Sequence, residues 1–120
     1  MVSKFFILLS LFVSACASNP RIENLSSKER QRVSAIKVFR GEADRPVTLL
    51  GTVDGLSCHR NAYSTNDVGE EEAMEGVKIK AALLQADAIV NVVCQKNSGT
   101  DWMNNCFGSV KCIGDAASYQ

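Results

Sequence analysis

The five cysteines of this 120-residue chain constrain its fold more than any other feature. The leader before them has the layout of an export signal, with Lys4 ahead of the apolar segment Phe5–Val13 and small residues after it. That segment is far shorter than the roughly 20 residues that span a bilayer, so it predicts export rather than a membrane span. Export delivers a chain to an oxidising compartment, where thiols pair. One cysteine directly follows the leader and four lie further along: Cys16, Cys58, Cys94, Cys106 and Cys112.

Cys16 ends the tetrapeptide Val13-Ser-Ala-Cys16, which looks like a bacterial lipobox. In signals of that kind the peptidase cuts before the cysteine, and the cysteine then carries acyl chains such as palmitate. Several chains hold a protein on a membrane almost permanently, whereas one chain is marginal. The next residue is Ala17 and not aspartate, which by similarity to enterobacterial sorting rules predicts transfer to the outer membrane. The alternative is an ordinary signal peptide whose cleavage site precedes a cysteine by chance.

The other four cysteines predict two disulfides rather than a metal site. Structural zinc sites usually bring thiolates in close pairs such as C-x2-C. Here the two nearest cysteines, Cys106 and Cys112, have five residues between them. His59 would be the extra ligand of a metal site, but it also fits a solvated loop. We therefore expect no metal and no other cofactor.

The spacing of the cysteines excludes one of the three possible disulfide pairings and leaves two open. Cys106 and Cys112 would stand about 20 Å apart along one strand, beyond the roughly 7 Å between Cα atoms that a disulfide allows. Two pairings remain: Cys58–Cys106 with Cys94–Cys112, or Cys58–Cys112 with Cys94–Cys106. A simple hairpin of the last two strands favours the second.

Composition divides the chain into a leader over residues 1–15, a lipidated N-terminus and linker over 16–34, and a folded domain over 35–120. The linker is polar and carries one proline. Ser26 and Glu29 could form a capping box that starts a short helix there. A disordered spacer fits the composition slightly better.

The folded domain is expected to be α+β, with about four strands and one main packed helix in the order β-β-α-β-β. The helix is expected over residues 70–85, because three glutamates match the positive end of its dipole and apolar residues recur at helical spacing. Gly76 inside it indicates close packing against the sheet. The strands are expected over residues 36–40, 48–53, 88–93 and 107–113. The dipeptide Asp54-Gly55 predicts a turn after the second strand, with Cys58 in the following loop, and Gly114 starts a tail.

Composition also excludes several classes of function. Loss of the leader removes one of the 13 basic residues and none of the 13 acidic ones, so the remaining chain is almost neutral. Its net charge therefore gives no reason to expect that it binds nucleic acid. The sequence has one histidine, no Ser-His-Asp order and no phosphate loop. We therefore expect no catalytic residues and no enzymatic activity.

Five segments of the chain carry a family resemblance. They are the lipobox Cys16, Leu50-Gly-Thr-Val-Asp-Gly-Leu-Ser-Cys58, Ala86-Asp-Ala-Ile-Val90 leading to Cys94, Cys106-Phe107, and Val110-Lys-Cys-Ile-Gly114. Together they resemble the RcsF family of outer-membrane lipoproteins, which sense envelope stress for the Rcs phosphorelay of enteric bacteria. The resemblance implies a non-enzymatic sensor. It also implies two non-consecutive disulfides, Cys58–Cys106 and Cys94–Cys112, and we follow it against the hairpin preference.

The resemblance implies partners and a location. Members of the family reach the inner-membrane repressor IgaA when their outer-membrane confinement fails, and BamA and other outer-membrane barrels hold them otherwise. This places a lipid anchor in the outer membrane and the folded domain in the periplasm, with a linker that could reach the cell surface. A structural or metal-handling bacterial lipoprotein is the alternative, because small α+β domains of this kind also resemble a heavy-metal-binding family.

The linker departs from the family pattern, which is longer, basic and rich in proline. Residues 17–34 reach about 60 Å when fully extended and about 25 Å as a flexible coil. The apolar band of an outer-membrane barrel is about 25 Å tall. Threading through a barrel therefore requires a nearly stretched linker.

Overall fold

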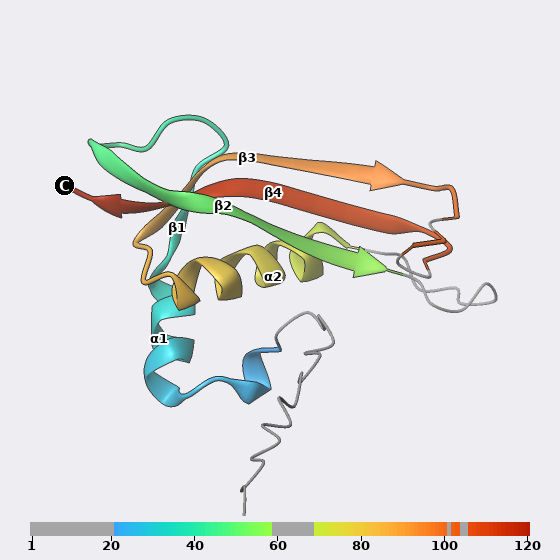
Figure 1. The fold of residues 1–120 in the computed structure, drawn as a ribbon, viewed down its shortest axis with the longest axis horizontal. Coiled ribbons are helices and arrows are strands. Elements are labelled where there is room, and N and C mark those ends of the chain that lie inside the picture. Colours follow the sequence, from blue (N-terminus) through green and yellow to red (C-terminus); the bar gives the residue numbers. More distant parts are fainter. Residues whose placement is uncertain (1–20, 59–68, 101, 104–105) are drawn as a thin grey trace, which may run out of the picture.

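The computed structural model describes residues 21–58, 69–100, 102–103 and 106–120 (Figure 1). Its elements run in the order η1 (Ile22–Asn24), α1 (Ser27–Ala35), β1 (Lys37–Val38), β2 (Val47–Cys58), α2 (Glu70–Leu83), β3 (Ala88–Asn97) and β4 (Ser109–Tyr119). The expected α+β class, with a four-stranded sheet and one main helix packed on it, is confirmed.

The sheet has the strand order β1-β3-β4-β2, so the last two strands of the chain form its centre. β1 runs parallel to β3, and β4 is antiparallel to both of its neighbours. Figure 1 shows α2 crossing one face of the sheet and α1 near the C-terminal end of α2, on the side away from the strands. The core lies between α2 and the sheet and includes Val53, Ala73, Val77, Ile79, Ile89, Val92, Val110 and Ala116.

The main helix, α2, begins at Glu70 as predicted and ends at Leu83. Its three leading glutamates stand where the dipole is positive, which favours a helix start here. The close packing expected of Gly76 is confirmed, since a Cβ there would stand 3.1 Å from the Cα of Gly55 in β2. Two glycines facing each other let the helix backbone approach the strand.

The segment expected to be a spacer is largely folded. Ser26 caps α1, its hydroxyl accepting a hydrogen bond from the backbone N–H three residues later at 3.2 Å. Val33 is buried in the core, and Ile22 and Leu25 pack against it. Of the two alternatives, the short helix is therefore correct. The linker predicted over residues 16–34 is shortened, because the domain begins near Ile22.

β2 extends further than the sequence predicts. It continues through Asp54-Gly55 to Cys58, where a turn and a loop are expected from the local pattern. Tertiary contacts override that pattern. Gly55 lies directly against the backbone of α2, where any side chain would collide, and Asp54 forms ion pairs with Lys80 and Lys111 at 2.7 and 3.7 Å.

β4 also extends further, through the expected tail to Tyr119. Small residues make this possible, because Gly114 lies so close to β3 that a Cβ would stand 2.6 Å from a methyl group of Ile89. Ala116 and Ala117 are fully buried beyond it. β1, by contrast, is limited to Lys37–Val38.

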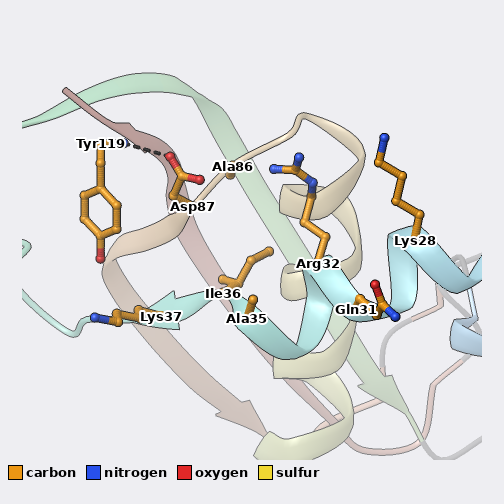
Figure 2. Close-up of a pocket in the computed structure, with 9 residues that line it drawn as sticks. All are labelled: Lys28, Gln31, Arg32, Ala35, Ile36, Lys37, Ala86, Asp87 and Tyr119. Atoms are coloured by element: carbon orange, nitrogen blue, oxygen red, sulfur yellow. Dashed lines mark hydrogen bonds between the residues drawn. The ribbon is translucent and has the colours of Figure 1, made fainter.

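A pocket of about 400 Å³ opens at the end of the sheet remote from Cys58 (Figure 2). It lies between α1, β1 and the segments at the start of β3 and the end of β4. Nothing in the sequence patterns assigns a role to the side chains that line it.

Candidate functional site

The four cysteines beyond the leader gather in one half of the sheet. Cys58 ends β2, Cys94 and Cys112 face each other in β3 and β4, and Cys106 lies in the connection between those strands. Disulfides join Cys58 to Cys106 and Cys94 to Cys112, with Cα atoms 5.4 and 4.0 Å apart. Cys106 and Cys112 are fully buried, so solvent reaches the two bridges only from the side of Cys58 and Cys94.

The observed pairing is the one that the family resemblance implies, and the preference drawn from a simple hairpin is wrong. β3 and β4 do form an antiparallel hairpin, but its register sets Cys94 opposite Cys112. The last paired residues are Asn97 and Ser109, so Cys106 lies in a long connection outside the ladder. The preference placed the last strand over residues 107–113, directly after Cys106, whereas β4 begins at Ser109.

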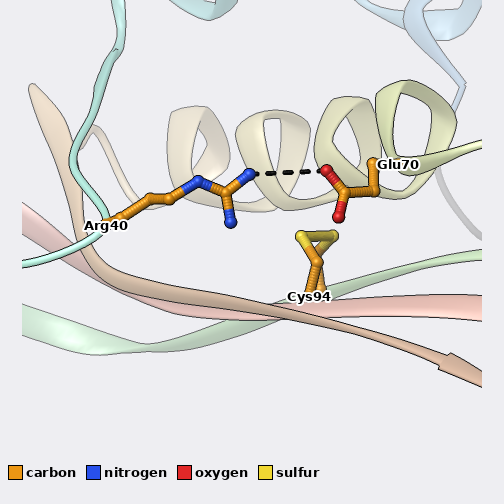
Figure 3. A network of polar contacts seen from close by, with 4 residues as sticks. Arg40, Glu70 and Cys94 are labelled. Atoms are coloured by element: carbon orange, nitrogen blue, oxygen red, sulfur yellow. Dashed lines mark hydrogen bonds and ion pairs between the residues drawn. A yellow bond between two sulfur atoms is a disulfide. The ribbon is translucent and has the colours of Figure 1, made fainter.

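An ion pair lies over the Cys94–Cys112 disulfide (Figure 3). Arg40 Nη2, from the segment after β1, stands 3.4 Å from Glu70 Oε2 in the first turn of α2. Figure 3 shows the bridged sulfurs between this pair and the strands. Both charged side chains are more than half exposed, so the pair adds less than about 1 kcal/mol to stability. The pair links the segment after β1 to the first turn of α2.

Ser57 holds the same end of the domain together. It is 1% exposed, and its hydroxyl accepts a hydrogen bond from the Gly69 backbone N–H at 3.3 Å and donates one to Glu72 at 3.1 Å. Gly69 is the N-cap of α2 and has no side chain to satisfy the helix, so the neighbouring strand supplies the cap. Sequence reasoning missed Ser57, because a serine within a strand gives no signal until the topology places a helix end beside it.

The residues expected to carry lipidation and sorting, Cys16 and Ala17, lie outside the described residues, as does His59. Within the described ranges, no helix has the length and apolar character needed to cross a membrane. The four thiols that a zinc site would use are all bonded to another sulfur, so in this state they are not free to ligate a metal.

Comparison with known proteins bears on the fold. No protein-family model matches the chain, and no curated protein matches it. A solved structure that is similar to it is a protein with unknown function from Pediococcus pentosaceus ATCC 25745, described as belonging to the DUF74 family. The TM-score is 0.55 at 18% identity, and the likeness covers 71% of this chain and 98% of that one. At such low identity, the likeness shows a shared fold alone.

Proposed function

We propose that this chain is an outer-membrane lipoprotein that senses envelope stress and activates the Rcs phosphorelay by engaging the inner-membrane repressor IgaA. The crossed disulfide pairing, Cys58–Cys106 with Cys94–Cys112, carries the proposal. Local hairpin reasoning favours the other pairing, and only the family resemblance implies this one. The way in which the four cysteines pair therefore adds support to the resemblance beyond their positions in the sequence.

The same pairing weighs against a metal-handling role built on cysteine. A zinc site requires ionised thiolates, and here all four thiols are oxidised. Two disulfides are also typical of a domain that folds in an oxidising compartment. This supports a folded domain in the periplasm.

The tether of the proposed sensor is short. Four residues separate Cys16 from Arg21, where the described part begins, and five Cα–Cα steps span at most about 18 Å. The apolar band of an outer-membrane barrel is about 25 Å tall. While Ile22 and Leu25 stay packed on the domain, the tether is too short to cross such a barrel. BamA and other barrels would therefore contact the folded domain from the periplasmic side.

A short tether makes the position of the anchor the switch in this proposal. With the anchor in the outer membrane, the folded domain stays beside that membrane and away from the repressor. An anchor in the inner membrane would place the same folded domain next to the repressor. Signalling would then require no change in the fold.

Ala17→Asp tests this switch without touching the folded domain. The sorting rule predicts that the variant stays in the inner membrane, and we expect strong constitutive output from an Rcs-responsive promoter. The measurement pairs membrane fractionation with the promoter reporter, in an enteric host that lacks its own sensor. Ala17→Ser is the matched control and should behave like the wild type. Cys16→Ala should accumulate as unprocessed or misplaced precursor.

Two results would contradict the proposal at different points. Abundant Ala17→Asp protein in the inner membrane with only basal promoter output would exclude the sensor function and favour a structural lipoprotein. A Cys16→Ala protein that is processed and sorted like the wild type would exclude lipidation at this residue.

A further inference from the structure

Three cationic side chains line the pocket at the end of the sheet. Lys28 and Arg32 stand one turn apart on α1, and Lys37 lies in β1. In the part of the chain that the structure describes, none of the three forms an ion pair or a side-chain hydrogen bond. Figure 2 shows Lys28 and Arg32 extending in the same direction from α1, with the guanidinium of Arg32 directed toward Ala86 and Asp87.

Among the described residues that line the pocket, Asp87 is the one acidic residue, and its carboxylate already accepts hydrogen bonds. Its Oδ2 accepts hydrogen bonds from the Tyr119 backbone N–H at 3.0 Å and from the Ser118 hydroxyl at 3.3 Å. These bonds hold the carboxylate at the end of β4 and away from Arg32. Three cations against one carboxylate leave the lining with an excess of two positive charges.

Tyr119 contributes a hydrogen-bond donor without an acceptor. Among the described residues, its buried hydroxyl has no partner. The guanidinium of Arg45 lies 4.0 Å from the ring centroid and holds the ring in place. Figure 2 shows the hydroxyl end directed toward Lys37. A buried hydroxyl without a partner is unfavourable, so the Tyr119 hydroxyl is available to donate to an acceptor that enters the pocket.

We propose that this pocket binds a phosphate group. Arg32 and Lys28, which extend in the same direction from α1, would neutralise the phosphate, and an oxygen of its ester group would accept a hydrogen bond from the Tyr119 hydroxyl beside Lys37. The volume of about 400 Å³ lies within the range of small-ligand pockets and exceeds the needs of inorganic phosphate. A phosphate ester such as a glycerol phosphate therefore fits the space. The inference goes beyond the sensing function and stands without it.

The phosphate can come from a free ligand or from a lipid headgroup. α1 is the first α-helix after Cys16, so a chain anchored at Cys16, as in the proposed function, holds the pocket close to membrane headgroups. A free phosphate ester would need no anchor. The bound chemistry is the same in both cases, and the choice of probe separates them.

Isothermal titration of the full chain in nonionic detergent tests the proposal with two probes, inorganic phosphate and dihexanoyl-phosphatidylglycerol. We expect binding by the wild type and a loss of about tenfold in Arg32→Ala, the effect of one charge-assisted hydrogen bond. Tyr119→Phe should weaken binding of the lipid about threefold or more without lowering the melting temperature, since its hydroxyl has no partner to lose among the described residues. Tighter binding of the lipid than of phosphate points to the headgroup, and equal or weaker binding points to a free ligand.

Arg30→Ala is the matched control, because Arg30 is exposed on the same helix and does not line the pocket. It should bind both probes like the wild type. Should Arg32→Ala melt at a lower temperature, the double variant of the exposed Lys28 and Lys37 to alanine replaces it. No heat with either probe would overturn the proposal, as would an equal loss in Arg30→Ala. Unchanged binding by Tyr119→Phe would overturn the role of its hydroxyl.

Discussion

The two ends of the sheet are held together by different means. At the pocket end, β3 and β4 are buried against the core, with Ala88, Ile89, Ala116 and Ala117 fully inaccessible. At the other end, the side chains of residues 95–97 in β3 are exposed. There the two disulfides add to the burial of β4, in which Val110 is also part of the core. A domain of this size buries a limited core, and the cross-links lie where that core is thinnest.

Removing a disulfide should have the largest effect. Loop-closure entropy predicts about 4 kcal/mol for Cys58–Cys106, with a sequence separation of 48, and about 3 kcal/mol for Cys94–Cys112, with a separation of 18. We expect the double alanine variant of either pair to unfold at a lower urea concentration than the wild type under non-reducing conditions. The variant that lacks Cys58–Cys106 should be the less stable of the two. Circular dichroism follows the transition.

Hydrogen exchange on the same variants tests the difference between the two ends. Loss of Cys94–Cys112 should raise exchange at Lys96 and Val110 more than at Ala116 and Ala117. Val93→Ala, next to Cys94 but 65% exposed, is the control and should change little. An equal rise in the exchange rate at both ends would show that the domain opens as one unit. It would contradict the proposed difference between the two ends of the sheet.

Gly55→Ala should have the next largest effect. The added methyl group would push α2 away from β2, the strand that ends at the disulfide-bonded Cys58. A Cβ at Gly55 would collide with the carbonyl oxygen of Ala73 and crowd the backbone nitrogen of Val77. Overpacking of this kind costs roughly 1–3 kcal/mol. For a small domain, that lowers the melting temperature by roughly 4–8 °C per kcal/mol. Gly41→Ala is the matched control, because a Cβ there meets nothing within 4 Å. Similar melting temperatures for the two variants would show that α2 can shift to make room.

Local sequence signals predicted the parts of the fold that local forces decide. The start of α2 follows from Glu70 and its acidic neighbours at the positive end of a helix dipole. The strand at Ala88 follows from its β-branched residues. The spacing of Ser26 and Glu29 indicated the cap of α1, although the composition slightly favoured a disordered spacer. In each case the physical cause lies within one turn of helix or a few strand residues.

The features that sequence reasoning missed depend on residues far apart in the chain. From its neighbours in the sequence, Gly55 is expected in a turn. In the structure it is a strand residue, because α2 packs directly against it. Ser57 becomes a helix cap only because β2 ends beside Gly69. Tyr119 lines a pocket only because the expected tail joins the sheet as part of β4. The disulfide pairing belongs to the same group, and only the family resemblance anticipated it.

The smallest effect is expected from the ion pairs of Asp54, which link β2 to α2 and β4 between the two ends. A hydrogen bond from Lys80, followed by the charges of Lys80 and Lys111, holds the pKa of Asp54 below its usual value of 3.8. A lowered pKa in the folded state means that the ionised form stabilises the fold above about pH 4, and that this stabilisation is lost as the pH falls further. Because the Asp54 side chain is 46% exposed, the contribution is at most about 1 kcal/mol.

Urea unfolding of the wild type and Asp54→Asn at pH 7, 5 and 3 measures this contribution. The variant should be slightly less stable at pH 7 and 5, and the difference should shrink at pH 3, which lies below the usual pKa of 3.8 of the carboxyl group in the unfolded chain. Added salt should shrink it at pH 7 as well, because the pairs are partly exposed. Glu75→Gln, on an exposed part of α2, is the control and should show no such pH dependence. A difference that stays constant from pH 7 to pH 3 would assign the role of Asp54 to packing in β2, and the charged link between helix and sheet would be withdrawn.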